Sequence, residues 1–186
     1  MDYLKLYNLE KYLFEVVQPR FAQDHKLAAF DFFCIIIWKA NRAISKIANL
    51  LCKKDKQSHR DLDAIVGELT TSLFSANSDK EKMRILINDW KFLLPTASAI
   101  LAVLWPENFT VYDINVCNEL KKHHKVKNKK FENLWSGYTV YLNDVRNSEQ
   151  TISSLRDKDK TSAIFLTIYK TTTYVDCFLE LSSTSA

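Results

Sequence analysis

The sequence predicts an all-α fold, and a shortage of turn-forming residues is the first reason. The 186 residues include only two glycines, Gly67 and Gly137, and three prolines, whereas average usage predicts about 13 glycines. Sandwiches, barrels and doubly wound sheets need many tight turns, which depend on such residues. Apolar residues also recur at helical intervals along most of the chain. Because no repeat or low-complexity linker divides the sequence, we expect one compact multi-helix domain over residues 1–186.

Three helices are expected before residue 75. An apolar stripe over residues 3–17 predicts a first helix, which we expect Pro19 to end. A second, longer helix is predicted from about Ala28 to Cys52. Its first half is nearly apolar all round, as is typical of a helix through the middle of a fold. After the charged loop over residues 53–58, a third helix is expected over 61–74.

A capping box marks the start of the fourth helix. Ser78 is followed three residues later by Glu81, the spacing at which the two side chains bond each other's backbone N–H groups. The helix that follows carries the apolar residues Met83, Ile85, Leu86 and Trp90.

The next stretch is the most informative part of the chain. An apolar helix predicted over residues 95–105 runs into a break at 106–109. The short hydrophobic segment 110–112 then leads to Asp113, at the start of a helix predicted over 114–120. An Asp at a helix start is held by its own capping bonds, so Asp113 is expected to be a carboxylate fixed in one place.

The remaining elements complete the predicted fold. Residues 121–130 break the periodicity, and an amphipathic helix is expected over 131–145. Ser153 or Ser154 is predicted to cap a helix from Leu155 to about Tyr169, whereas the β-favouring composition of residues 172–181 gives only a weak helical signal. The predicted core includes Phe32, Ile36, Ile100, Leu101, Leu104, Leu134 and Ile164.

Charge and cysteine usage limit the classes of function. A net charge of +4 and a pI near 8.8 permit an anionic partner without requiring one. The four cysteines are far apart and no signal peptide is recognisable, so we expect reduced thiols in a cytoplasmic protein with no metal site or cofactor. No apolar run reaches the roughly 20 residues of a membrane span, and we therefore expect a soluble protein.

Three blocks of sequence occur in a familiar order. They are IWKANRA at residues 37–43, the stretch from Leu94 to Asp113 with its ASAIL helix and Pro-x-x-Phe turn, and LRDKDK at residues 155–160. Together they resemble a divergent, little-characterised bacterial branch of the helix-hairpin-helix DNA glycosylase superfamily. The resemblance covers about 125 residues and implies an all-α, nucleic-acid-binding core, with DNA favoured over RNA.

The resemblance also implies roles for individual residues. It makes Asp113 the catalytic carboxylate of an N-glycosidic hydrolysis, stabilising a developing oxocarbenium ion. The family's lyase members have a nucleophilic Lys where this chain has Pro95, so any enzyme here would be a monofunctional glycosylase without lyase activity. The hairpin glycines are replaced by Lys91-Phe92-Leu93, which leaves the Lys91 side chain to contact a phosphate.

Two alternatives to a glycosylase remain open. Asp113 alone is equally well explained as a helix cap, and the chain would then be a non-catalytic helix-hairpin-helix-like module that binds DNA or a protein partner. A purely structural or assembly protein is the third possibility. An open, positively charged cleft around Asp113 would favour the enzyme, and burial of Asp113 against its own helix would favour the module.

The densest positive charge lies at residues 121–130, with six lysines and two histidines. Such a run can follow a phosphate backbone, although a solvated loop is the commoner outcome. The histidines His123 and His124 show no metal-ligand spacing and are expected to lack a carboxylate partner. The predicted contacts to nucleic acid are Lys91, Lys121, Lys122, Lys125, Lys127 and Lys129.

A possible pocket is predicted around Trp38, Arg42 and Tyr112. Trp38 and Arg42 are four residues apart and would stack on one helix face. The alternative places Trp38 in the core and pairs Arg42 with Asp157 or Asp159. Arg156 and Lys160 share a face at the same spacing, which suits a structural ion pair better than a phosphate contact.

Overall fold

The computed structural model describes residues 9–54 and 61–147. Every element in these ranges is a helix and none is a strand, so the all-α prediction is confirmed. The chain divides into two compact units, Met1–Trp105 and Pro106–Ala186. The expectation of one domain over residues 1–186 stays a prediction.

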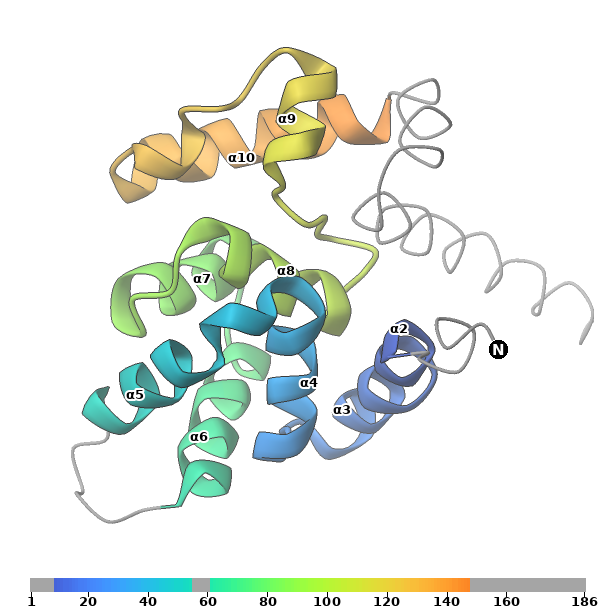
Figure 1. Ribbon diagram of the computed structural model, residues 1–186, viewed down its shortest axis with the longest axis vertical. Coiled ribbons are helices and arrows are strands. Elements are labelled where there is room, and N and C mark those ends of the chain that lie inside the picture. Colours follow the sequence, from blue (N-terminus) through green and yellow to red (C-terminus); the bar gives the residue numbers. More distant parts are fainter. Residues whose placement is uncertain (1–8, 55–60, 148–186) are drawn as a thin grey trace, which may run out of the picture. The chain divides into compact units, whose positions relative to one another are not determined.

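The first unit contains a series of short helices (Figure 1). In chain order they are α2 (Leu9–Tyr12), η1 (Leu13–Val17), α3 (Gln18–Asp24), α4 (Ala29–Ala40), η2 (Asn41–Ala43), α5 (Ile44–Lys54), α6 (Leu62–Phe74), α7 (Asp79–Arg84), η3 (Ile85–Asp89) and α8 (Leu94–Leu104).

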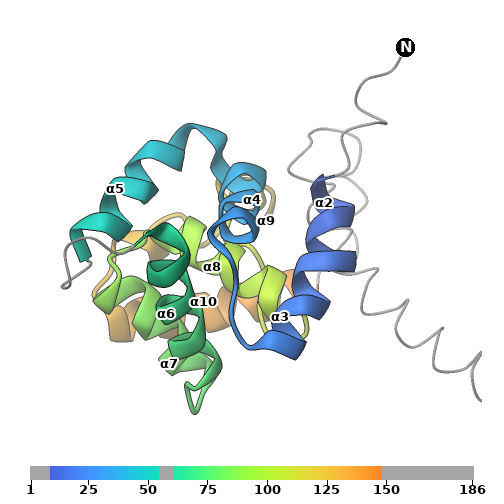
Figure 2. The same ribbon diagram turned by 90° about the horizontal axis from the view of Figure 1, so that it is seen from below.

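Helix α8 forms the centre of this unit. It contacts α3, α4 and α7, and Figure 2 shows it among these neighbours. All of its residues except Pro95 and Thr96 are buried. Ala97, Ala99 and Ala102 are small enough for neighbouring helices to approach closely, and the surrounding apolar side chains supply the hydrophobic burial.

Two predicted helix boundaries are wrong. Pro19 does not end the first helix, because η1 is a π-turn in which the Gln18 N–H bonds Leu13 and the chain enters α3 with the proline in its first turn. At that position the missing proline N–H costs little. The helix predicted from Ala28 to Cys52 is interrupted at Ala40, whose φ of −158° and ψ of 73° lie outside the helical region, and it resumes through η2 into α5.

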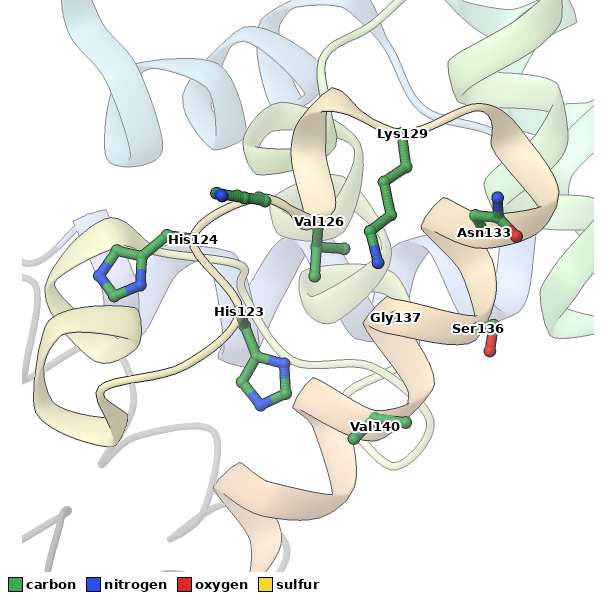
Figure 3. A pocket seen from close by; sticks show the side chains of 9 residues that line it. His123, His124, Val126, Lys129, Asn133, Ser136, Gly137 and Val140 are labelled. Carbon is green, nitrogen blue, oxygen red and sulfur yellow. The ribbon is translucent and has the colours of Figure 1, made fainter.

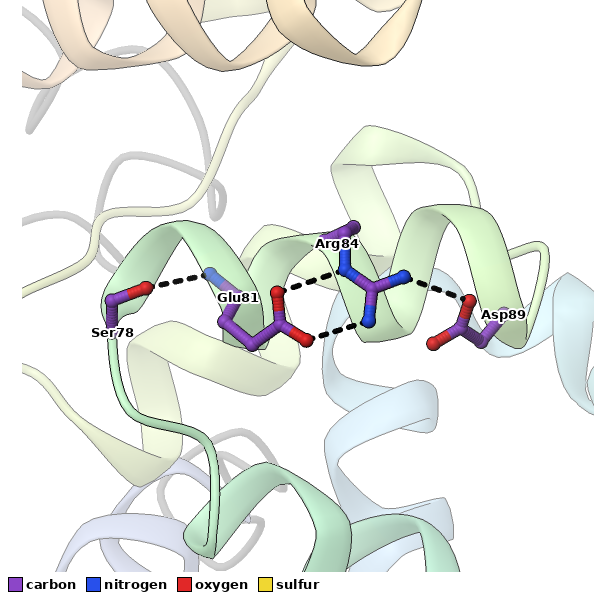
Figure 4. Close-up of polar contacts among 4 residues, drawn as sticks. All are labelled: Ser78, Glu81, Arg84 and Asp89. Atoms are coloured by element: carbon purple, nitrogen blue, oxygen red, sulfur yellow. Dashed lines mark hydrogen bonds and ion pairs between the residues drawn. The ribbon is translucent and has the colours of Figure 1, made fainter.

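The predicted helix starts at Asp61 and Ser78 are confirmed, but the Glu81 carboxylate is directed to Arg84 and not back to the Ser78 N–H as a capping box would have it. Asp61 caps α6 by accepting the Ala64 N–H at 2.8 Å, and Ser78 caps α7 by accepting the Glu81 N–H at 3.2 Å. The Glu81 carboxylate pairs with Arg84 at 2.5 Å, and Arg84 also contacts Asp89 at 3.2 Å (Figure 4). This ion pair lowers the pKa of Glu81 through the hydrogen bond from Arg84.

A charged residue is buried where α4 packs against the first helices. Asp31 is 1% exposed, and it accepts hydrogen bonds from the Tyr12 hydroxyl at 2.6 Å and from Arg20 at 2.7 Å. A buried carboxylate needs such partners, since desolvation without them is costly. The hydrogen bond to Asp31 raises the pKa of Tyr12.

The described part of the second unit, residues 106–147, contains an extended segment, two α-helices and one short 3-10 helix. Residues 106–113 lead into α9 (Ile114–Leu120), and a loop with the short η4 (Val126–Asn128) connects α9 to α10 (Phe131–Arg146). Both helices match their predicted ranges closely.

Six of the seven predicted core residues, Phe32, Ile36, Ile100, Leu101, Leu104 and Leu134, are buried. The seventh, Ile164, lies outside the described residues. So do the block at 155–160 with Arg156, Asp157, Asp159 and Lys160, the helix predicted over 155–169, and the segment 172–181. Among the described cysteines Cys34, Cys52 and Cys117 are free thiols. None of the described helices is long and apolar enough to cross a membrane.

Candidate nucleic-acid interface

Helix α10 holds the extended segment through two tyrosine hydroxyls. The Tyr138 hydroxyl donates to the Thr110 carbonyl at 2.6 Å and accepts the Thr110 N–H at 3.1 Å. One turn later, the Tyr141 hydroxyl donates to the Val111 carbonyl at 2.9 Å and accepts the Asp113 N–H at 3.3 Å. Both tyrosines are fully buried. Each hydroxyl therefore satisfies buried backbone groups that no sheet or helix ladder pairs, and we name these four contacts the tyrosine clamp.

The tyrosine clamp fixes Asp113 at the start of α9. Asp113 has an extended backbone, and its Oδ1 accepts the Asn115 N–H at 2.8 Å. Asp113 as a whole residue is 9% exposed. The N-cap prediction is therefore confirmed, and the carboxylate is directed at its own helix start.

The loop after α9 begins with two left-handed residues. Lys121 ends α9 at φ 54° and His123 follows at φ 68°, a region that residues with a Cβ enter at a cost. The Tyr112 hydroxyl donates to the His123 carbonyl at 2.7 Å. The His123 ring lies 2.9 Å from the Asp144 carboxylate on α10, and Lys122 lies 3.6 Å from the same carboxylate. These contacts hold the first part of the loop against α10.

The prediction that the histidines lack a carboxylate partner is wrong for His123. Asp144 is 21 residues away along the chain, and only the packing of the loop on α10 brings the two together. The hydrogen bond from His123 lowers the pKa of Asp144, and the nearby charge of Lys122 adds to this effect. His124 instead contacts the Asn118 side chain at 2.9 Å.

The second part of the loop is held by a close apolar contact. Val126 is 4% exposed and packs against Gly137 of α10. A Cβ at Gly137 would lie 3.0 Å from the nearest Val126 methyl carbon, tighter than ordinary van der Waals contact. The absence of a side chain at Gly137 therefore allows η4 to lie directly on the helix.

The loop exposes all of its lysine side chains. We name residues 121–130 the lysine loop; its members Lys121, Lys122, Lys125, Lys127, Lys129 and Lys130 are exposed. Lys122 is paired with Asp144, and the other five have no ion-pair partner within residues 9–54 and 61–147. The structure thus brings together five of the six predicted nucleic-acid contacts on one anchored loop.

A groove separates part of the lysine loop from α10 (Figure 3). It has a volume of about 600 Å³, within the usual range for small-ligand sites. In Figure 3, Lys129 extends from the loop over the groove towards α10, with Val126 beside it. The lining residues are His123, His124, Lys125, Val126, Lys129, Asn133, Ser136, Gly137 and Val140.

The sixth predicted contact, Lys91, belongs to the other unit. It lies in the turn between η3 and α8, is exposed, and has φ 61°, a conformation that favours glycine. The Phe92 N–H bonds back to the Leu86 carbonyl at 2.9 Å, which closes the end of the preceding helix in the manner of a Schellman motif. Position 91 therefore has the backbone conformation that glycine would favour, but it carries a lysine side chain.

The predicted pocket residues are in different surroundings. Trp38 is half-buried and packs edge-on against Phe14, at 6.1 Å between ring centroids. Arg42 is exposed on η2, so the break after Ala40 removes the helical spacing that was expected to align it with Trp38. Tyr112 is 1% exposed in the second unit, and burial raises its pKa. Its hydroxyl anchors the lysine loop.

Sequence reasoning missed the residues that hold the loop in place. The signal for Tyr138 and Tyr141 was weak, because two tyrosines on the apolar face of a helix usually indicate core packing. Asp144 gave no local signal, and neither did Asn133 and Ser136, which line the groove. In the described ranges no cluster of three or more His, Cys, Asp or Glu side chains is arranged to hold a metal ion.

Comparisons of the chain with protein-family models, with curated proteins and with solved structures found no match. The helix-hairpin-helix resemblance therefore stays a prediction.

Proposed function

We propose that this protein binds nucleic acid through the lysine loop, by electrostatic contacts to the phosphate backbone. The observation that supports this most directly is the group of five exposed lysines without an ion-pair partner among the described residues, on a loop anchored to α10. Neutralised phosphates release counterions, and this release gives a run of lysines its affinity for nucleic acid.

The anchoring of the loop favours binding over a merely solvated charge run. The Tyr112–His123 bond, the His123–Asp144 contact and the Val126–Gly137 packing keep the loop backbone in one arrangement. Lysines on a backbone that is already ordered lose less conformational entropy when they meet a polyanion. A loop that served only solubility would not require a glycine contact on the facing helix.

The burial of Asp113 supports a non-catalytic module over a glycosylase. A catalytic carboxylate has to reach the sugar of an extruded nucleotide. Asp113 is 9% exposed, caps α9, and does not line the groove under the lysine loop. We therefore propose that Asp113 is a structural residue that sets the start of α9, and through it the position of the lysine loop.

Charge reversal in the lysine loop tests the binding proposal. In Lys121→Glu/Lys127→Glu, two exposed lysines become acidic, and duplex DNA affinity is expected to fall by about tenfold or more at low salt. Fluorescence anisotropy with a labelled duplex measures this. The charge-matched control is Lys46→Glu/Lys53→Glu, since both lysines are exposed on α5. Equal losses in the two variants would indicate a general charge effect and would contradict the proposal.

A base-release assay tests the role of Asp113. On a panel of duplexes with modified bases, the non-catalytic proposal expects no release by the wild-type protein. Release that is abolished by Asp113→Asn would establish the glycosylase instead, because the amide retains capping but loses the negative charge. Borohydride is expected to trap no covalent complex, since Pro95 occupies the position where lyases have their lysine.

A further inference from the structure

We propose that the groove between the lysine loop and α10 binds one unpaired nucleotide of a single-stranded nucleic acid. This inference rests on the proposed function and names the form of nucleic acid that the same surface prefers. It depends on three kinds of lining residue that a simple phosphate-binding patch would not need.

The first kind is cationic and lies on the loop side. Lys125 and Lys129 both line the groove, and neither has an ion-pair partner among the residues that the structure describes. An ammonium group binds a phosphate oxygen as a strong, charge-assisted donor. These two lysines therefore suit the phosphate of a nucleotide that enters the groove.

The second kind can form neutral hydrogen bonds and lies on α10. Asn133 and Ser136 are three residues apart and share one helix face with Gly137 and Val140. An amide offers both a donor and an acceptor, and a hydroxyl does the same. Base edges present this combination, whereas phosphate presents acceptors only. On a base edge the α10 side can use both its donors and its acceptors, whereas on a phosphate only its donors would be used.

The third kind is apolar and comes from both the loop and α10. Val126 is buried against Gly137, and Val140, which is 51% exposed, lies one turn further along α10. An exposed apolar side chain next to polar groups is suited to cover the face of a base. The rings among the lining residues are the imidazoles of His123 and His124, which already contact Asp144 and Asn118. The base would therefore pack mainly on aliphatic carbon, unlike on a Phe, Tyr or Trp platform.

The groove is suited to a single strand because its hydrogen-bonding wall needs a free base edge. In a duplex the Watson–Crick edges are paired and the bases are stacked, and extruding one costs a few kcal/mol. A single strand presents its bases without that cost. Duplex DNA has the higher charge density, so purely electrostatic binding would favour the duplex. A preference for the single strand would therefore come from the groove.

The test compares two exposed asparagines on the same helix. Asn133 lines the groove and Asn143 does not, so Asn133→Ala and Asn143→Ala are chemically matched. Anisotropy of the full chain with single-stranded DNA, single-stranded RNA and duplex DNA gives the three affinities. We expect tighter binding of a single strand than of the duplex. We also expect Asn133→Ala to weaken single-strand binding by about two- to tenfold, the effect of removing one hydrogen bond, with duplex binding and Asn143→Ala unchanged.

A second measurement identifies the occupant. Amide chemical shifts of the wild-type protein are followed during titration with adenosine monophosphate and, separately, with inorganic phosphate. The nucleotide is expected to shift residues of both the lysine loop and α10, and phosphate to shift the lysine loop alone. Equal shifts on α10 by phosphate would overturn the nucleotide assignment.

The outcomes separate this inference from the proposed function. Salt-dependent binding with no single-strand preference and no effect of Asn133→Ala would overturn the groove assignment and leave the lysine loop as a backbone contact. Absence of salt-dependent binding to all three nucleic acids would overturn both. A single-strand preference that disappears in Asn133→Ala and persists in Asn143→Ala supports the groove, and the RNA and DNA arms show which strand it prefers.

Discussion

The two compact units stabilise their central segments by different means. In Met1–Trp105 the centre is α8, whose side chains are buried on nearly every side and are mostly apolar, with the Ser98 hydroxyl donating to the Pro95 carbonyl. In Pro106–Ala186 the central segment is Thr110 to Asp113, which has no ladder of its own and depends on the hydroxyls of Tyr138 and Tyr141. Burial of apolar side chains stabilises a helix without directing any particular backbone atom to a partner. Paired hydrogen bonds, in contrast, fix the positions of individual backbone atoms.

This difference explains why the candidate interface belongs to the second unit. The tyrosine clamp sets the position of Asp113, Asp113 starts α9, and α9 leads directly into the lysine loop. Arg146 at the end of α10 also donates to the Glu107 carbonyl. Helix α10 therefore contacts the rest of the unit at several points along its length, which makes it a rigid support for the loop that carries the charged side chains.

The largest expected effect tests the apolar side of the comparison. Leu101 of α8 is fully buried, and Leu101→Ala should lower the free energy of unfolding by about 2–5 kcal/mol, because it removes buried apolar surface and leaves a cavity. Urea denaturation measures the change. Leu93→Ala is the control, since Leu93 is 67% exposed and a surface change should stay within about 0.5 kcal/mol. Similar costs for the two variants would mean that α8 is not the centre of the unit.

The next effect tests the tyrosine clamp. Tyr141→Phe keeps the ring and removes a hydroxyl that bonds the Val111 carbonyl and the Asp113 N–H. Leaving buried backbone groups unpaired should cost about 1–3 kcal/mol.

Hydrogen exchange assigns that destabilisation to the clamp. The Asp113 amide is expected to exchange faster in Tyr141→Phe, and the Thr110 amide, which Tyr138 holds, is the internal control. Unchanged protection at Asp113 would show that the Tyr141 hydroxyl does not hold the segment.

The two glycines give opposite predictions in the two units. Gly137→Ala should destabilise by about 1–3 kcal/mol through overpacking against Val126. It should also weaken nucleic-acid binding, because the lysine loop is displaced from α10. Gly67→Ala should stabilise α6 by about 0.5–1 kcal/mol, since a Cβ there meets nothing within 4 Å and alanine is the better helix former. Thermal melts of the two variants measure the two changes in stability. Shifts of the melting temperature in the same direction would contradict this account of Gly137.

The smallest expected effect concerns pH. The His123 hydrogen bond and the Lys122 charge lower the pKa of Asp144 in the folded protein. The resulting stabilisation is complete above the ordinary aspartate pKa of 3.8, and it is lost as the pH falls from there through the lower folded-state pKa. Wild type should therefore be more stable than Asp144→Asn well above pH 3.8, and the difference should vanish at a pH below both values. A stability difference between wild type and Asp144→Asn that stays constant over this pH range would mean that the contact between His123 and Asp144 is not ionic.

The sequence predicted elements with a local signal and missed those that depend on distant packing. Helix starts at Asp61, Ser78 and Asp113 were predictable because capping involves residues two or three positions apart. The break after Ala40 was not, since nothing in the surrounding apolar sequence marks it.

The same limit applied to the candidate site. The lysine run was visible as composition. Its anchoring depends on contacts of Gly137, Asp144, Tyr112 and Tyr141, and these contacts join residues that lie 11 to 30 positions apart in the sequence. One of only two glycines in the chain was the available clue to a close approach, and the sequence alone did not identify its partner.

The central claim is that exposed lysines on an anchored loop contact phosphates, and the salt dependence of binding tests it most directly. The logarithm of the association constant for duplex DNA should fall linearly with the logarithm of salt concentration. For Lys121→Gln/Lys127→Gln the slope should decrease by about two, roughly one for each phosphate that is no longer neutralised. Lys46→Gln/Lys53→Gln should keep the wild-type slope. A slope that is the same in all three proteins would contradict the claim.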